Sequence, residues 1–310
     1  MDLYLHLGPH LTGVSALHRW LEAGRTRLAD RGVALWLKGE TRDGRFSGLF
    51  AAPQAVDLAC ERRGQRSCGV IRLRLAELAR AGMDRLVVSD PDLLGPPQAA
   101  RPSVGRYPHV DERLLRLAPA IGPLCRRVGL ALRSYADLAE DMAALQLWLT
   151  GRWPASVDLS AEGILRRRWP GIVAEIRRAL PGAEVALWSY ERLADRPEAQ
   201  LARLTGDPAI ADGLPRPAAP GPGAVPDLPA LRKRLRFLGR PGLAEALGPG
   251  DGRWQPLDPH TRLRVEAAYA RDLDRLGPML TGASRAPQPT PDPPPDERTA
   301  AHDRQETRSF

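Results

Sequence analysis

The stretch LYLHLGPHLTGVSALHRWL, residues 3–21, decides the fold that we expect for this chain. Leucines at every second position from 3 to 7 predict a buried strand, and Gly8 and Pro9 end it. Apolar residues then recur at helical spacing from Val14 to Leu28. A strand, a loop and a helix in this order leave backbone N–H groups free beside the positive end of the helix, an arrangement that can hold a phosphate.

The same alternation of strands and helices continues along the chain. Further strands are predicted at residues 31–36, 85–90, 127–133 and 183–193, and further helices at 72–82, 111–117, 134–149, 160–180, 228–238 and 259–277. This order predicts right-handed crossovers and an α/β fold, with a mostly parallel sheet flanked by helices. Ligands of such sheets bind outside the carboxyl ends of the strands. Those ends are predicted at residues 8–15, 89–92, 133–135 and 189–191.

The length of 310 residues allows one large domain with a full core. We predict an α/β domain over residues 1–281, of which the part from about 228 to 281 is helical. Residues 282–310 are rich in proline and have almost nothing apolar to bury, so we predict a disordered tail there.

The composition is that of a soluble protein, with 43% hydrophobic and 26% charged residues. The sequence has no apolar run long enough for a membrane span and begins without the pattern of a signal peptide, so we expect a cytoplasmic protein. Cys60, Cys68 and Cys125 form no C-x-x-C pair, and we expect them to be reduced and buried.

The net charge of +8 suggests an anionic partner. However, Lys38 and Lys233 are the only lysines, and 43 of the 45 basic residues are arginine. This bias is typical of a GC-rich coding sequence, and the chain has no RNP motif, zinc finger or helix-turn-helix pattern. We therefore expect no nucleic-acid partner.

The loop after the first strand matches most of the Walker A pattern G-x-x-x-x-G-K-[ST]. The pattern is matched at Gly8, Gly13 and Ser15, but Val14 occupies the place of the lysine. Nucleotide hydrolases use that lysine to neutralise the phosphates being transferred. A P-loop kinase or NTPase therefore remains only as an alternative function, because the chain lacks the lysine that such enzymes use.

The segment LHLGPHLTGVSALH, residues 5–18, resembles the first strand and loop of bacterial sulfotransferases that use PAPS, which run close to LHIGPHKTGTTSLQ. The positions that match are His6, Gly8, Pro9, His10, Thr12 and Gly13, and Leu11 stands where the family has its loop lysine. The resemblance implies a P-loop-like sulfotransferase fold and PAPS as co-substrate. It also implies a loop that holds the 5′-phosphosulfate, made of Gly8, Pro9, His10, Leu11, Thr12, Gly13, Val14 and Ser15.

Three weaker segments extend this resemblance over about residues 2–205. VVSDPDLLG at 87–95, followed by RYP at 106–108, resembles an acidic segment of the family, and LWSYERL at 187–193 is similar to its late Tyr-Glu segment. Residues 127–142 resemble the segment that binds the 3′-phosphate, which makes Arg133 the phosphate-binding arginine. Asp141 stands where the family has a serine, and its carboxylate would repel a phosphate.

Two departures affect the predicted catalytic groups. Leu11 cannot stabilise the charge that develops on the leaving oxygen, so His10 or Lys38 would have to replace the lysine. The family's acidic residue aligns near Pro91, which leaves Asp90 and Asp92 as candidates for the base that activates the acceptor, or as carboxylates that cap the loop.

Taken together, the residues predict sulfuryl transfer from PAPS to a hydroxyl or amine of a small-molecule or glycan acceptor. The alternative is a catalytically impaired homologue, a pseudoenzyme that binds or scaffolds, because Leu11, Pro91 and Asp141 all depart from the motifs. We predict no metal site, since His6 and His10 lie on a strand and its loop and do not converge. The arginines at 166–168 are either a solvated helix face or an attractant for an anionic acceptor or the nucleotide.

Overall fold

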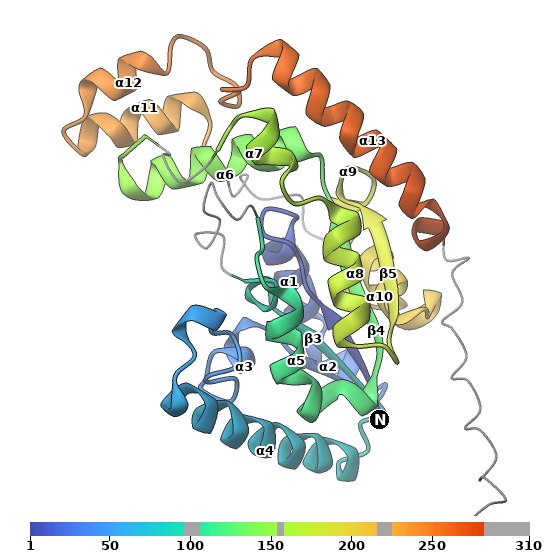
Figure 1. Ribbon diagram of the computed structural model, residues 1–310. Coiled ribbons are helices and arrows are strands. Elements are labelled where there is room, and N and C mark those ends of the chain that lie inside the picture. The colour runs from blue at the N-terminus through green and yellow to red at the C-terminus, as the bar shows by residue number, and fades with distance from the viewer. Residues whose placement is uncertain (96–105, 154–157, 216–224, 282–310) are drawn as a thin grey trace, which may run out of the picture.

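The structure is a computed structural model that describes residues 1–95, 106–153, 158–215 and 225–281. Within these residues a five-stranded, fully parallel sheet has the strand order β2-β3-β1-β4-β5 (Figure 1). The strands are β1 (Asp2–His6), β2 (Val33–Trp36), β3 (Arg85–Ser89), β4 (Cys125–Leu132) and β5 (Glu184–Ser189). The predicted α/β fold with a parallel sheet flanked by helices is confirmed.

Helices cover both faces of the sheet because the strand residues alternate between two apolar clusters. Leu3 and Leu5 of β1 point into the larger cluster, and Tyr4 between them packs against the smaller one. The larger cluster is closed by α4 (Leu58–Arg80), α5 (Val110–Ile121) and α8 (Trp169–Ala179), and the smaller by α1 (Val14–Ala23), α2 (Arg25–Ala29) and α10 (Pro197–Thr205).

A third layer lies beyond the carboxyl ends of the strands (Figure 1). It consists of α6 (Tyr135–Thr150), α7 (Ala161–Leu165), α11 (Leu228–Phe237), α12 (Pro241–Ala246) and α13 (Pro259–Thr281). Leu231, Leu235 and Trp254 pack against Ala143 and Leu147 of α6 in an apolar cluster of their own. The late part of the chain therefore covers α6, which follows directly on β4.

Short helical turns complete the described chain. They are α3 (Lys38–Thr41), α9 (Tyr190–Leu193), η1 (Pro53–Ala55), η2 (Pro91–Leu93), η4 (Gly122–Leu124) and η5 (Pro208–Ala211). Cys60, Cys68 and Cys125 are free and buried. Across the described ranges no helix is both long and apolar enough to cross a membrane. The predicted disordered tail at 282–310 lies outside the described residues.

Several predicted boundaries were wrong. The single helix predicted at 160–180 is two helices, α7 and α8, because Arg168 is extended and a new helix begins at Trp169, with Pro170 in its first turn. The strand predicted at 183–193 ends at Ser189, where α9 begins. The helix predicted at 72–82 begins much earlier, at Leu58, after Asp57 caps it by accepting a hydrogen bond from the Cys60 N–H at 2.7 Å.

Candidate functional site

The loop at residues 8–15 leaves β1 and enters α1, and its shape depends on two glycines. Gly8 has φ 92°, and a Cβ added there would lie 2.8 Å from Cβ of Pro91. Gly13 has φ 75° and precedes the first residue of α1. Residues with a side chain rarely adopt such φ angles, so glycine at both positions lets the loop turn tightly against the segment that follows β3.

The loop presents unused hydrogen-bond donors. Among the described residues, the N–H groups from Leu11 to Ser15 have no acceptor. The Ser15 hydroxyl is likewise unpartnered within the described chain and exposed, whereas the Thr12 hydroxyl donates to the Pro9 carbonyl at 2.6 Å. Because these groups lie at the positive end of α1, which is ten residues long, the loop can accept an anion.

Leu11 occupies the predicted lysine position with a left-handed backbone, φ 62°. Its partly buried side chain packs against the large apolar cluster, and its carbonyl accepts a hydrogen bond from Nη1 of Arg133. A non-glycine residue at such an angle is strained by about 1–3 kcal/mol and persists where its surroundings fix it. Leu11 therefore supplies no cation at the position of the lysine.

Two neutral histidines, His6 before the loop and His18 after it, lie against the same serine at the end of β3. Oγ of Ser89, at the end of β3, lies 2.8 Å from Nδ1 of His6 and 2.8 Å from Nε2 of His18. Burial lowers the pKa of His6 to about 3 and that of His18 to about 4. Nε2 of His6 is buried without a partner in the described chain, so we assign its proton to Nδ1, which donates to Ser89, while Ser89 donates to His18.

The predicted catalytic residues His10, Asp90 and Asp92 lie together at this edge. Nε2 of His10 is 2.8 Å from Oδ1 of Asp92. Oδ2 of Asp92 accepts from Arg42 at 2.7 Å. Asp90 is fully buried and accepts from Thr41 at 2.6 Å, from Arg42 at 3.2 Å and from the Asp92 N–H at 2.9 Å. Asp90 therefore has the capping contacts of a loop carboxylate, and Asp92 holds His10.

Lys38 is a cation near this edge without an ion-pair partner among the described residues. Its charge adds to the effect of burial in lowering the pKa of His18. The pKa of Asp92 is lowered first by the hydrogen bond from His10, and the charges of Arg42 and Lys38 add to that effect. Lys38 begins α3 directly after β2, so its charge acts on the side chains beside the loop.

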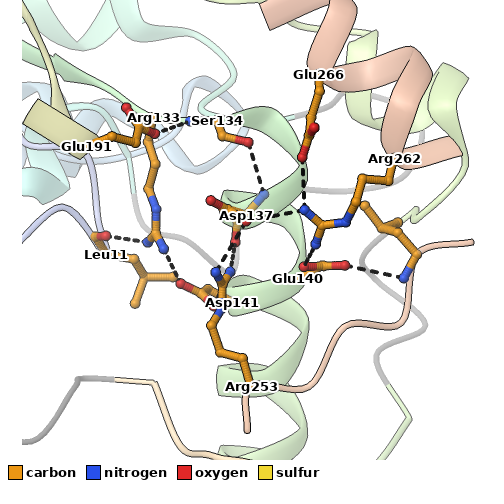
Figure 2. Close-up of polar contacts among 11 residues, drawn as sticks. Leu11, Arg133, Ser134, Asp137, Glu140, Asp141, Glu191, Arg253, Arg262 and Glu266 are labelled. Atoms are coloured by element: carbon orange, nitrogen blue, oxygen red, sulfur yellow. Dashed lines mark hydrogen bonds and ion pairs between the residues drawn. The ribbon is translucent and has the colours of Figure 1, made fainter. Parts of the chain in front are cut away.

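Arg133, the predicted phosphate-binding residue, is buried at the end of β4 and already has partners (Figure 2). Nη2 donates to Oδ2 of Asp141, and Nη1 donates to the Leu11 carbonyl. The guanidinium lies 4.8 Å from the centre of the Tyr190 ring, and the Arg133 carbonyl accepts from Nε1 of Trp169 at 2.9 Å. Asp141, at the position of the family's serine, thus binds the arginine that was expected to hold a phosphate.

Asp141 belongs to a chain of ion pairs that ties α6 to Arg253, in the segment before α13, and to α13 itself (Figure 2). Its Oδ1 accepts from Nε of Arg253 at 2.8 Å, and Arg253 also lies 3.2 Å from Asp137. Glu140, the residue before Asp141, pairs with Arg262 of α13. Arg253 could not be found from the sequence, because only the fold brings residue 253 to α6.

The four predicted strand ends meet in the structure. Tyr190 stacks on Arg133 and lies 3.8 Å from a Cβ built on Gly13, which joins the end of β5 to the loop. Tyr107, from the RYP segment, accepts from the His10 N–H at 3.1 Å. Arg42 was missed, although it follows β2 at the same edge and the rule applied to the other strands would have found it.

No group of three or more His, Cys, Asp or Glu side chains that could hold a metal occurs in the part of the chain that the structure describes. Comparison of the chain with protein-family models, with curated proteins and with solved structures finds no match.

Proposed function

We propose that the chain binds PAPS at the carboxyl edge of its sheet and transfers the sulfuryl group to a hydroxyl or amine of an acceptor. The observation that carries the proposal is the run of unused N–H donors from Leu11 to Ser15, with Arg133 bound to the same loop. The donors suit the phosphosulfate group, and a guanidinium suits the 3′-phosphate.

The two ends of the nucleotide fit this edge unequally. The loop can accept an anion without rearrangement, since its donors have no acceptor in the described chain. Arg133 is neutralised by Asp141, so a 3′-phosphate has to take the place of that carboxylate. Arg253 lies 2.7 Å from Oδ1 of Asp141 and would remain its counter-charge after the exchange. Binding of the 3′-phosphate therefore includes the cost of opening a buried ion pair.

The remaining groups suggest a division of roles. In sulfuryl transfer the acceptor atom bonds to sulfur while the bond from sulfur to the phosphate oxygen breaks, and the acceptor loses its proton. Nε2 of His10 is held by Asp92, which leaves Nδ1, 3.5 Å from the Tyr107 hydroxyl, to take that proton. Lys38 is the cation that we assign to part of the developing charge, and it does not replace the loop lysine in full.

A second candidate function is a protein that keeps the nucleotide-binding edge without turnover. The contact between Arg133 and Asp141 favours it, because a carboxylate fixed on the phosphate-binding arginine competes with the nucleotide. Leu11, packed against the apolar cluster, also gives the loop no charge for catalysis.

The two candidates are separated by restoring the lysine with Leu11→Lys and measuring PAPS turnover, with Leu11→Gln as an uncharged control. If the edge is catalytic, Leu11→Lys raises turnover by about 10²–10³-fold, the usual effect of one such electrostatic group, and Leu11→Gln does not. PAP binding without turnover in Leu11→Lys would select the non-catalytic function. A folded Leu11→Lys protein that neither binds PAP nor consumes PAPS would remove both.

A further inference from the structure

A small cavity rich in arginine lies where α7 ends, α8 begins and α13 passes over them. Its volume is about 250 Å³, below the range of about 300–1,000 Å³ that is usual for drug-sized ligands. The charged residues that line it are Arg166, Arg167, Arg168, Asp272 and Arg275. None of them belongs to the loop at 8–15 or to the ion pairs around Arg133.

Two of the four arginines are already neutralised. Asp272 is buried and holds Arg168, whose Nε lies 2.7 Å from Oδ2. Arg167 is 2.9 Å from Oε2 of Glu175 and also donates to the Tyr107 carbonyl at 3.0 Å. These contacts fix both side chains, so they form rigid walls of the cavity.

Arg166 and Arg275 are different, because neither has an ion-pair partner among the described residues. Asp272 holds Arg168 and also accepts from the Tyr135 hydroxyl at 2.6 Å, and it forms no ion pair with Arg166 or Arg275. Within the described residues, two exposed guanidinium groups without an ion-pair partner therefore line one small cavity.

We propose that this cavity is a binding site for a sulfate or phosphate monoester group. Guanidinium groups bind such oxyanions through paired, charge-assisted hydrogen bonds, and two of them match a doubly charged phosphate. The small volume fits the anionic group of a ligand with its immediate attachment. The cavity is an anion site additional to the edge around Arg133, and it does not depend on sulfuryl transfer.

The test is calorimetric titration of the full chain with glucose 6-phosphate and, separately, with glucose 6-sulfate, in saturating PAP and about 0.15 M salt to screen distant charges. The variant Arg166→Ala/Arg275→Ala removes these two charges. The matched control, Arg177→Ala/Arg236→Ala, removes two exposed arginines that do not line the cavity and leaves the net charge equal to that of the test variant.

We expect at least one ester to bind, and its affinity to fall about tenfold or more in Arg166→Ala/Arg275→Ala while the control changes little. The preferred ester identifies the group that the site takes. The proposal is overturned if neither ester binds the wild-type chain in the presence of PAP, or if both double variants weaken binding equally. Because PAP occupies the other edge throughout, failure here leaves the proposed function untouched, and the converse also holds.

Discussion

The ends of β1 and β4 lie side by side, yet they are built from opposite kinds of interaction. After β1, the loop rests on neutral groups, His6, Ser89 and His18, and its own N–H donors are unused within the described chain. After β4, Arg133 is buried in an ion pair with Asp141, which Arg253 also holds. The loop after β1 can accept an anion without losing a contact, whereas the guanidinium after β4 already binds the carboxylate of Asp141.

This difference suggests how the site is controlled. An anionic ligand gains the unused donors of the loop without losing any contact, but it reaches Arg133 only by replacing a carboxylate of this chain. Acidic pH should lower the free energy of unfolding through the histidines at the end of β1. Removal of a single charge should lower it through the ion pair at the end of β4.

The largest effect is expected from pH and acts on the end of β1. Below about pH 6.5 the unfolded chain protonates both histidines, whereas burial keeps the pKa of folded His6 near 3 and that of His18 near 4. The unfolded state then binds more protons, so the free energy of unfolding falls as the pH falls from 6.5. At pH 5 each histidine lowers it by about 2 kcal/mol, about 4 kcal/mol for the pair.

Urea denaturation at pH 8 and at pH 5 measures this loss. His18→Gln should reduce the loss by about half, while His260→Gln, at an exposed position, should leave it unchanged. An equal loss in wild type and His18→Gln would show that the histidine pair does not stay neutral.

The next effect concerns the buried ion pair after β4. Arg133→Ala should lower the free energy of unfolding by about 3 kcal/mol, because Asp141 is then buried with Arg253 alone. The double variant Arg133→Met/Asp141→Leu should lose much less than the two single changes added together. Arg126→Ala, on the same strand but in an exposed pair 3.6 Å from Asp2, should cost less than about 1 kcal/mol. Denaturation curves that show additive single changes would contradict a coupled pair.

A smaller effect is expected at Gly8. Gly8→Ala forces a side chain onto φ 92° and against Cβ of Pro91, which should cost about 2 kcal/mol. Gly69→Ala, in α4 with nothing within 4 Å of the added Cβ, should instead stabilise the chain by about 0.5–1 kcal/mol. Thermal unfolding of both variants decides the matter, and an unchanged midpoint for Gly8→Ala would mean that the loop is not held tightly against Pro91.

The sequence predicted the parallel sheet because strand patterns and turn signals depend on local order. It also placed Arg133 and the loop at one edge, since the carboxyl ends of parallel strands converge. Helix boundaries were less accurate: α4 was cut short because its first half, with Gly64, Arg62 and Arg63, shows little apolar spacing.

The partners of the site residues could not be predicted in the same way. Asp141 was expected to repel a phosphate, but its ion pair with Arg133 depends on one turn of α6 facing the end of β4. Arg253 reaches Asp141 from 112 residues further along the chain. Such contacts are set by tertiary packing, on which local sequence patterns carry no information.

The most direct test of the proposed nucleotide site is a calorimetric titration of PAP into wild type, Asp141→Ser and Arg133→Ala. If Arg133 receives the 3′-phosphate in exchange for Asp141, Asp141→Ser should bind PAP about tenfold or more tightly than wild type, and Arg133→Ala about tenfold or more weakly. A folded Asp141→Ser protein that binds PAP no better than Arg133→Ala would contradict the assignment of this edge to the nucleotide.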